Sequence, residues 1–418
     1  MSDATSSLQH VGVVGAGTMG AGIATSCLAS GLKVALIDTE AQALESGQRR
    51  IADALDGAVR RGKLAAEAAA AARARLAPAG DFSALGAADV VIEAVYENLA
   101  LKQDIFRALD ASCRANTLLA TNTSTLDVAA IASATARPQD VIGMHFFSPA
   151  HIMRLVEIVR APQTSPASIA RALALTAHIG KIGVVVGNCF GFVGNRMLYA
   201  YGRENQLMLL EGVAPQRIDA VLEGFGMAMG PNAVGDLAGL DVGYRVRRER
   251  KDLPDDARYY RVADLLVEHG RLGQKSGRGM YRYASGARQR EVDPEVEPLI
   301  RAEAARLGIA PRMHGDEEIL KRCLYALINE GAAILGEGVA ATPRDIDLIW
   351  CNGYGFPRER GGPMAYADSL GLATVYEGIR HFAAKYGARY WSVAPLLAQL
   401  AAANSTFAAW QAVRAHQP

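Results

Sequence analysis

The sequence has little net charge and few cysteines. It contains 44 Lys and Arg residues against 43 Asp and Glu residues, which gives a formal net charge of +1. Such a balanced chain gives no reason to expect a nucleic-acid binder or a polybasic membrane-binding protein. The five cysteines are odd in number, scattered, and without a CxxC pair. This argues against a disulfide framework or a zinc site and favours a reducing compartment.

Long apolar runs and a secretory leader are also lacking. No apolar run approaches the roughly 18 residues of a membrane-spanning helix, and the Ala-rich stretch Leu64–Ala77 is interrupted by three charged residues. The first ten residues have neither the basic nor the apolar region of a signal peptide. We therefore expect a cytoplasmic protein without a membrane span. Its 418 residues, half of them hydrophobic, suffice for two or three domains.

The first 187 residues alternate short apolar runs with helical segments. Strands are expected at His10–Val14, Val34–Ile37, Val90–Ala94, Thr117–Ala120, Val141–Met144, Ile152–Ile158 and Ile182–Val186. Helices are expected at Met19–Ser30, Glu40–Arg75, Leu101–Arg114, Asp127–Ala132 and Ser168–Ile179. The alternation predicts an α/β domain of the Rossmann type over residues 1–187.

Beyond residue 187 the strand pattern gives way to long helical segments that contain an internal repeat. The string Arg196–Leu198 and the Glu-Gly-Val after it recur at Arg322–Leu324 and Glu337–Val339. We therefore predict two repeated all-α domains, over residues 188–290 and 291–418, joined by the polar stretch Ala284–Asp316. The second copy lacks a counterpart of the loop Gly191–Asn195, so its role is expected to be structural. Pairing of the two copies within one chain predicts a monomer.

The first expected strand runs into a GxGxxG motif formed by Gly15, Gly17 and Gly20. The glycines allow a tight turn, close approach of a pyrophosphate and close helix–strand packing. Asp38 ends the second strand, where a carboxylate binds ribose hydroxyls and repels a 2′-phosphate, so NAD is expected rather than NADP. The alternative is that the glycines serve only a turn and Asp38 caps the next helix.

A second pattern pairs His145 with Glu157. Both lie six residues from His151, in segments that a turn around Pro149 could bring back toward each other. A neutral imidazole can accept a proton from an alcohol, and a buried carboxylate on its other nitrogen fixes the tautomer. For an isolated pair of this kind, a structural histidine and a surface glutamate are the commoner interpretation.

Four further features each have a functional and a structural interpretation. Ser124 lies in a Ser/Thr run that follows an expected strand, and Asn195 lies near the start of a long helix; both could bind a substrate oxygen or cap a helix. The run Arg60–Lys63 could meet the phosphates of an anionic substrate or form a solvated helix end. The loop Arg271–Tyr281 could reach a ligand or be a structural turn.

Taken together, these residues make the chain resemble the (3S)-3-hydroxyacyl-CoA dehydrogenase family, most of all the dehydrogenase half of peroxisomal-type multifunctional β-oxidation enzymes. The most specific strings are GMHFFSPAHIMRLVEIV, GKIGVVVGNCFGFVGNRM, GPNAVGDLAGLDVG, EEILKRCLYALINEGAAIL and NGYGFPRERGGPMAYAD. The resemblance implies that His145 and Glu157 are the catalytic dyad and that Ser124 and Asn195 contact the substrate oxygen.

The resemblance also implies which residues bind the ligands. Five positions match contacts to NAD in relatives: Met19, Asp38, Glu97, Lys102 and Lys275. Arg61 falls near a CoA-contacting lysine of short-chain relatives. Ser148 departs from the family, because many relatives carry Asn there. The hydratase half of the multifunctional enzymes is expected to be missing, since only about nine residues precede the first strand.

The activity implied is oxidation of (3S)-3-hydroxyacyl-CoA by NAD to the 3-oxoacyl-CoA, with His145 as general base and Glu157 orienting it. Acyl-CoA is the expected small-molecule partner, with no nucleic acid, membrane or metal. Two alternatives stay open at this point: a dehydrogenase of the same fold that acts on a free hydroxy acid or a carnitine-like alcohol, and an NAD-binding protein without turnover.

Overall fold

The computed structural model describes residues 8–284 and 289–415. The outermost residues of the first and third predicted domains, and part of the predicted polar connection, lie outside these ranges. The chain divides into two compact units. The first comprises residues 1–195 and 337–353, and the second comprises residues 196–336 and 354–418.

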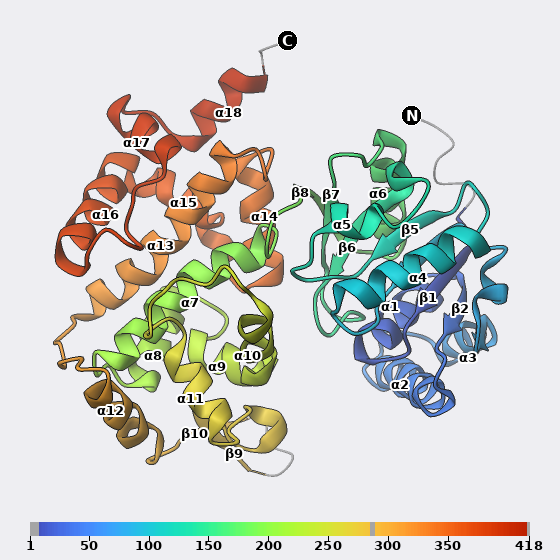
Figure 1. Cartoon of the computed structure of the whole chain (residues 1–418), viewed down its shortest axis with the longest axis horizontal. Coiled ribbons are helices and arrows are strands. Elements are labelled where there is room, and N and C mark those ends of the chain that lie inside the picture. Colours follow the sequence, from blue (N-terminus) through green and yellow to red (C-terminus); the bar gives the residue numbers. More distant parts are fainter. Residues whose placement is uncertain (1–7, 285–288, 416–418) are drawn as a thin grey trace. The chain divides into compact units, whose positions relative to one another are not determined.

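The first unit is built on one mixed sheet. Its strands in the described residues are β1 (His10–Val14), β2 (Lys33–Ile37), β3 (Leu76–Ala79), β4 (Val90–Glu93), β5 (Leu118–Thr121), β6 (Val141–Phe146), β7 (Leu155–Arg160) and β8 (Ile182–Gly187). Their order is β3-β2-β1-β4-β5-β6-β7-β8. The strands are parallel except at β6 and β7, which pair antiparallel. The predicted Rossmann-type fold is confirmed (Figure 1).

Helices cover both faces of this sheet, which is why its central strands are apolar on both sides. The helices are α1 (Thr18–Ala29), α2 (Ala41–Arg60), α3 (Ala66–Ala74), α4 (Leu99–Ser112), α5 (Val128–Ala132), α6 (Pro166–His178) and α14 (Pro343–Gly353). One hydrophobic cluster joins the sheet to α1, α2, α3 and α6, and another joins it to α4 and α5. The unit is thus a three-layer structure with the sheet in the middle.

One local prediction for this unit was wrong, and one strand was missed. The expected helix Glu40–Arg75 is two helices, α2 and α3, because the chain turns between them at Gly62, whose φ is +65°. Strand β3 was not predicted. Its sequence, Leu-Ala-Pro-Ala, has low strand propensity, and it pairs only with β2 at the edge of the sheet, where a proline is tolerated.

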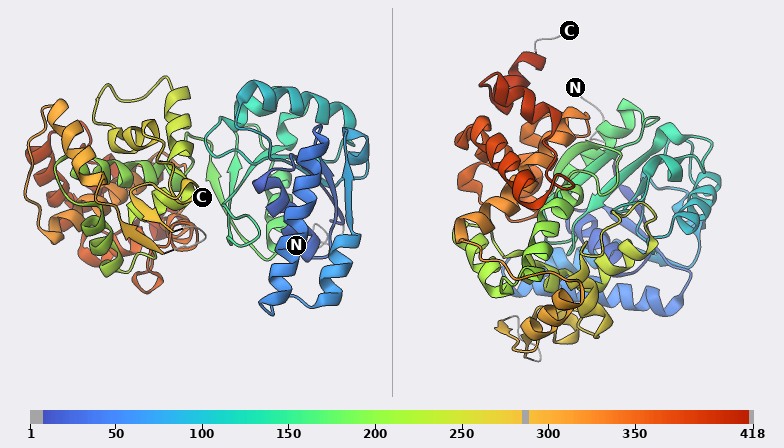
Figure 2. Two further views of the ribbon diagram at one scale, coloured as in Figure 1. Left: turned by 90° about the horizontal axis from the view of Figure 1, so that it is seen from below. Right: turned by 60° about the vertical axis from the view of Figure 1, so that its left-hand side comes forward.

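The second unit is almost entirely helical (Figures 1 and 2). It contains most of α7 (Gly194–Leu210), followed by α8 (Pro215–Phe225), α9 (Pro231–Ala238), α10 (Leu240–Glu249), α11 (Arg261–Glu268), α12 (Val296–Arg306), α13 (Asp316–Gly336), α15 (Pro363–Leu370), α16 (Leu372–Tyr386), α17 (Pro395–Ala402) and α18 (Phe407–Ala415). A short antiparallel hairpin joins β9 (Tyr281–Tyr283) to β10 (Arg290–Val292). The helical character that the sequence predicts after residue 187 is confirmed.

The predicted connection between the two copies has more structure than expected. Helix α12 lies within it and buries Val296, Ile300 and Ala304. This helix was not predicted because the segment is polar overall. Its three apolar residues are spaced four apart and therefore lie on one face of a helix.

The two helical copies pack together within the second unit. Arg322 of α13 is 1% exposed and pairs with Glu204 of α7 and with Glu211, the residue that follows α7. Nine residues further along α13, a side chain at Gly331 would collide with Met364 and approach Met197. The packing partner that the repeat needs is therefore on the same chain.

A segment of the second copy belongs to the first unit. Gly187, at the end of edge strand β8, donates its N–H to the carbonyl of Val339 over 2.6 Å, and Val186 forms a β-bridge with Ala340. Helix α14 then packs on β7 and β8. A Cβ atom at Gly353 would stand 2.6 Å from Leu155 of β7. Residues 337–353 thus cover the end of edge strand β8.

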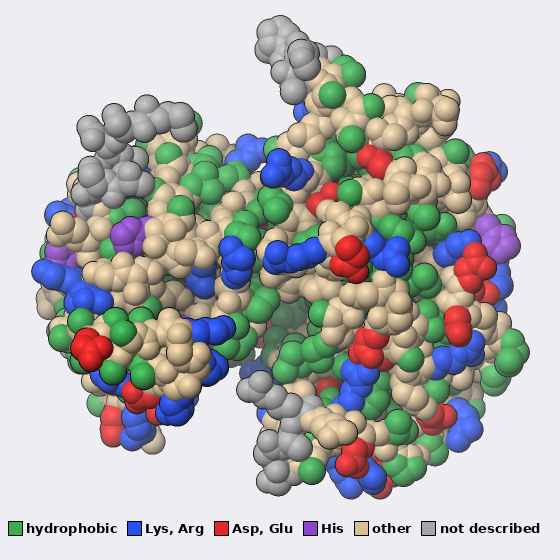
Figure 3. All heavy atoms as spheres, turned by 180° about the vertical axis from the view of Figure 1, so that it is seen from behind, with side chains coloured by type: hydrophobic (Ala, Val, Ile, Leu, Met, Phe, Trp, Pro, Cys, Tyr) green, Lys and Arg blue, Asp and Glu red, His purple; other side chains and the backbone are tan. Residues whose placement is uncertain are grey.

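The surface carries both signs of charge. On the helical unit as seen in Figure 3, basic and acidic side chains are interspersed rather than segregated, in keeping with the net charge of +1. Within the described residues, no helix combines the length and the apolar composition that crossing a bilayer requires.

Candidate active site

The His145–Glu157 pair lies near the C-terminal end of β6. The antiparallel register of β6 and β7 makes the two residues direct partners, as their spacing predicts. His145 Nδ1 stands 2.8 Å from Glu157 Oε2. Glu157 is fully buried and His145 is 6% exposed. A buried carboxylate on Nδ1 makes that nitrogen the donor, which leaves Nε2 with the lone pair that accepts a proton.

The second carboxylate oxygen of Glu157 binds the start of helix α7. Glu157 Oε1 accepts the backbone N–H groups of Val193 at 3.2 Å and Gly194 at 3.0 Å. A helix N-terminus carries a partial positive charge, so it stabilises this buried anion. Asn195 follows Gly194 directly, so one carboxylate ties the histidine to the segment that bears Asn195.

Two aromatic rings that were not predicted from the sequence flank His145. The ring centroids of Phe147 and Phe192 lie 4.5 Å and 5.7 Å from that of the imidazole. Phe192 is fully buried and has a φ of +50°, an uncommon conformation for a bulky residue. Both rings therefore lie close to the imidazole, whose residue is 6% exposed. Phe192 lies between two glycines of the GFVG string, which was the available sequence signal for an unusual backbone.

The segment after β5 lies at the same edge of the sheet. Because β1, β4, β5 and β6 are parallel, their carboxyl ends meet where ligands bind in open α/β sheets. Asn122, which the sequence analysis did not single out, accepts the N–H of Phe146 at 2.9 Å and so links this segment to the strand that carries His145.

Ser124 is held by Glu97. Glu97 Oε1 accepts the N–H of Ser124 at 2.8 Å, its hydroxyl at 3.2 Å and the hydroxyl of Thr123 at 2.6 Å. Burial acts to raise the pKa of Glu97, but the charge of Lys102 and these hydrogen bonds outweigh it, so the pKa is lowered. Glu97 is therefore an anion that fixes the conformation around Ser124.

The glycine-rich loop has the features that a dinucleotide needs. Gly15 has a φ of +100°, and a Cβ at Gly20 would stand 1.8 Å from the Gly15 carbonyl oxygen. A Cβ at Gly17 would meet nothing within 4 Å, so this position borders open space. Helix α1, which contains Met19, starts there without a side-chain cap. Its free N–H groups suit a pyrophosphate, and these residues fit NAD.

Asp38 connects this loop to the next helix. Its Oδ2 accepts the N–H of Ala16 at 2.8 Å, and its Oδ1 accepts the N–H of Glu40 at 3.1 Å. Each oxygen keeps a second lone pair for a ribose hydroxyl. The two interpretations of Asp38, ribose binding and support of the start of α2, are thus compatible.

Arg61 and Lys275 were also predicted to contact ligands. Arg61 ends α2 and is exposed. It lies near enough to His151 to act on it: burial lowers the pKa of His151, and the charges of Lys181 and Arg61 lower it further. Lys275 belongs to the second unit, where it forms an ion pair with Asp241.

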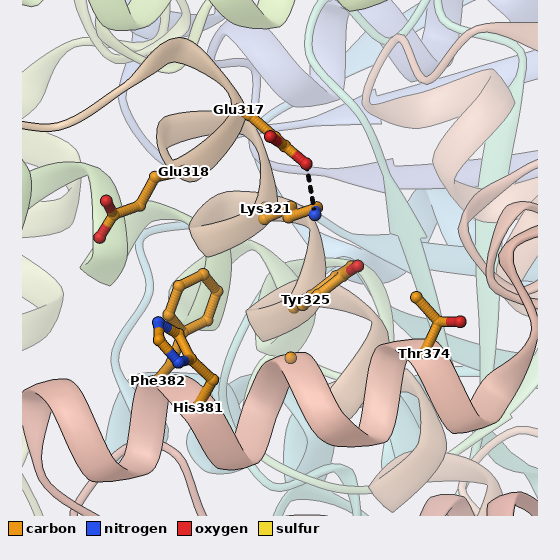
Figure 4. Close-up of a pocket in the computed structure, with 8 residues that line it drawn as sticks. Glu317, Glu318, Lys321, Tyr325, Thr374, His381 and Phe382 are labelled. Carbon is orange, nitrogen blue, oxygen red and sulfur yellow. Dashed lines mark hydrogen bonds and ion pairs between the residues drawn. The ribbon is translucent and has the colours of Figure 1, made fainter.

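An open pocket of about 390 Å³ lies elsewhere, between α13 and α16 of the second unit (Figure 4). Its lining residues are Glu317, Glu318, Lys321, Tyr325, Thr374, Gly378, His381 and Phe382. Glu317 and Lys321 pair with each other on its rim. None of the residues predicted for catalysis or cofactor binding lines this pocket. Its volume is therefore no reason to place the active site there.

Two family descriptions match the chain. The NAD-binding domain of 3-hydroxyacyl-CoA dehydrogenase matches residues 10–189. The C-terminal domain of 3-hydroxyacyl-CoA dehydrogenase matches twice, at residues 191–283 and 319–408. The double match agrees with the internal repeat found in the sequence.

Individual relatives agree with these matches. A solved 3-hydroxybutyryl-CoA dehydrogenase from Escherichia coli is 30% identical, with a TM-score of 0.81 over 95% of this chain and 99% of that one. The dehydrogenase part of multifunctional enzyme 1 from C. elegans is 30% identical, with a TM-score of 0.69 over 94% and 89% of the two chains. The peroxisomal bifunctional enzyme of Danio rerio is 46% identical over 90% of this chain. The chain spans about half the length of that relative.

Proposed function

Because the chain belongs to the 3-hydroxyacyl-CoA dehydrogenase family, we propose that it oxidises (3S)-3-hydroxyacyl-CoA to 3-oxoacyl-CoA with NAD, reversibly, in a step of the fatty-acid β-oxidation type. The observation that carries the proposal is the buried His145–Glu157 pair, 2.8 Å apart, at the sheet edge that also bears the glycine-rich loop. A histidine whose tautomer is fixed by a buried carboxylate, next to a dinucleotide loop, is what alcohol oxidation requires.

In this mechanism the chain moves one proton. His145 Nε2 accepts the proton of the 3-hydroxyl group, and Glu157 stabilises the resulting imidazolium through Nδ1. NAD, when bound, supplies the acceptor for the hydride that leaves C3. Ser124 and Asn195 hold the substrate oxygen as it changes from hydroxyl to carbonyl. Ser124 and Asn195 act mainly in the transition state, when charge develops on this oxygen. Their loss is therefore expected to lower kcat more than it raises KM.

NAD is held by residues of the glycine-rich loop and its neighbours. The N–H groups at the start of α1, next to Gly17 and Met19, bind the pyrophosphate, and Asp38 binds the adenosine ribose. The carboxylate of Asp38 repels a 2′-phosphate, and no cation stands beside it in the sequence at Thr39 or Glu40. Glu97, Lys102 and Lys275 are assigned to the cofactor by resemblance alone. Lys102 has no exposed side-chain surface, so it would reach the cofactor only after a rearrangement.

Arg61 is the candidate contact to the CoA portion of the substrate. It is exposed, and its charge and that of Lys181 both act on His151, so two cations lie near that residue in the first unit. A CoA thioester carries phosphates that such a surface attracts, whereas a free hydroxy acid or a carnitine-like alcohol does not need it.

One assay separates these substrate classes. NADH oxidation is measured with acetoacetyl-CoA and with free acetoacetate under the same conditions. The proposal predicts efficient turnover of the thioester and little of the free acid. Equal kcat/KM for the two substrates, or activity with acetoacetate alone, would refute the CoA assignment. Arg61→Ala is expected to raise KM for acetoacetyl-CoA and to leave KM for NADH unchanged.

We also propose that the chain is a monomer. The support is the packing of the two helical copies on each other, with Arg322 buried between Glu204 and Glu211. Light scattering after size exclusion should give a mass near 44.3 kDa. A stable species of twice that mass would contradict the proposal.

The cytoplasmic location stays a prediction from the sequence. Curated relatives such as those of Danio rerio and Homo sapiens are named peroxisomal, so the compartment needs a direct test. Fractionation of the native cells with an antibody against the chain distinguishes a cytoplasmic pool from an organellar one.

A further inference from the structure

A fully buried ion pair lies beneath the candidate active site. Glu93, the last residue of β4, and Lys102 of α4 both have no exposed side-chain surface. Lys102 Nζ stands 2.6 Å from Glu93 Oε1 and 3.5 Å from Glu97 Oε2. One buried cation is therefore shared by two carboxylates, with Glu93 the nearer.

Both carboxylate oxygens of Glu93 have hydrogen-bond partners. Besides Lys102, its Oε1 accepts the N–H of Val95 at 2.8 Å, and its Oε2 accepts the hydroxyl of Thr121 at 2.7 Å. In the sheet Glu93 pairs with Val14 of β1 and Thr121 of β5. These neighbours are the residues just before the glycine-rich loop and the Ser124 segment, so Glu93 lies under both.

We propose that Glu93 is a positioning residue for the dehydrogenase reaction, which holds Lys102 and through it keeps Glu97 on the backbone and hydroxyl of Ser124. The proposal rests on the function proposed above. Glu93 reaches neither substrate nor cofactor in this scheme and acts only through its neighbours.

The distances explain why Glu93 is needed. A buried ammonium group must be paired, since an uncompensated charge in the interior costs several kcal/mol. Because Glu93 satisfies Lys102 at close range, Glu97 keeps Oε1 for the N–H and hydroxyl groups of Thr123, Ser124 and Thr125. Without Glu93, Lys102 would have Glu97 as its only carboxylate in this network. Glu97 would then turn toward Lys102 and away from Ser124.

In this scheme Lys102 acts by holding Glu97, which is a role that a buried side chain can have. With no exposed side-chain surface, Lys102 cannot touch a ligand unless the structure moves. Acting through Glu97 requires no such movement.

The test uses the variants Glu93→Gln, Lys102→Met and the pair combined. Each single change leaves a buried charge without its partner, so both should lower Tm and lower kcat by roughly tenfold to a hundredfold, the size expected of a misplaced reacting group. The double variant removes both charges, and its Tm should recover. Its kcat should stay at least about tenfold down, because Glu97 Oε2 still lacks the ammonium group of Lys102 that stands 3.5 Å from it and anchors it.

Asp110→Asn provides a matched control on the same helix. Asp110 pairs with Arg137 at 2.8 Å, largely buried, and Arg137 holds the carbonyl of Thr117 at the opposite end of β5. This change should lower Tm and leave kcat unaltered.

A second measurement does not depend on turnover. Amide hydrogen exchange of residues 122–126 reports the N–H groups that Ser124 and Thr125 donate to Glu97. Exchange there should be faster in Glu93→Gln and unchanged in Asp110→Asn.

The outcomes distinguish the positioning role of Glu93 from the proposed dehydrogenase function. A double variant with recovered Tm and wild-type kcat, or unaltered exchange in Glu93→Gln, would overturn the positioning role. Wild-type protein that exchanges as expected but turns over no 3-hydroxyacyl-CoA would refute the proposed function and leave the network intact.

Discussion

Replacing Glu157 by Gln is expected to abolish the general base while keeping the shape of the site. In the structure, Glu157 Oε1 accepts two N–H groups from the start of α7, and Oε2 faces His145 Nδ1. A glutamine amide has one oxygen and one NH2 group. The oxygen must face the two N–H donors of Val193 and Gly194, since an NH2 group there would meet only donors.

The NH2 group then points at His145 Nδ1 and can only donate to it. The imidazole must therefore carry its proton on Nε2, which can no longer accept the substrate proton. A wrong tautomer of this kind costs between about a hundredfold and about 10⁴-fold in kcat. This corresponds to about 2.7 to 5.4 kcal/mol of transition-state stabilisation.

The assay compares kcat for (3S)-3-hydroxybutyryl-CoA in wild type and Glu157→Gln, with NADH binding and Tm as controls for folding. Both controls should change little. Combining Glu157→Gln with His145→Ala should give a kcat no lower than that of His145→Ala alone, because the two residues act as a unit. A Glu157→Gln kcat within about threefold of wild type, far short of a general-base loss, would refute the tautomer argument.

Three further predictions concern other parts of the molecule. Asp38→Ser should narrow the preference for NAD over NADP in kcat/KM, and equal use of both cofactors by wild type would rule out the ribose role of Asp38. Gly353→Ala should lower kcat and destabilise the protein by about 1 to 3 kcal/mol, since the new methyl group would stand 2.6 Å from Leu155; Gly224→Ala, in open space, is the control and should do neither. Hydrogen bonds from Arg306 and from Arg261 together lower the pKa of Glu303 from 4.5 to about 2, against the opposing effect of burial. The stability that Glu303 contributes is thus complete above pH 4.5 and is lost as the pH falls toward 2. In Glu303→Gln, Tm should therefore fall less steeply between pH 4.5 and pH 2 than in wild type. The same slope of Tm against pH in both proteins would contradict the ion pair.

Much of the first unit could be predicted from the sequence because its signals are local. Apolar runs gave most of the strands, and the equal spacing of His145 and Glu157 from His151 anticipated their pairing across β6 and β7. The GxGxxG motif likewise specified its own strand, turn and helix. In each case the decisive residues are neighbours in the chain or are joined by one tight turn.

The features that escaped prediction depend on contacts between distant segments. Glu93 meets Thr121 only because β4 and β5 are adjacent in the sheet, an order that no local pattern encodes. The pairing of Val339 with Gly187 likewise brings part of the second helical copy onto the first unit. Strand β3 was missed for a related reason, since its pairing with β2 overrides a poor intrinsic propensity.

The central claim is that His145 is the base in an NAD-dependent oxidation of 3-hydroxyacyl-CoA. The most direct test is NADH formation from (3S)-3-hydroxybutyryl-CoA and NAD by wild type and by His145→Ala, with NADH affinity measured on both. The account predicts turnover by wild type, a kcat at least about a hundredfold lower for His145→Ala, and the same NADH affinity. A His145→Ala protein with near wild-type kcat, or a wild type that forms no NADH, would contradict it.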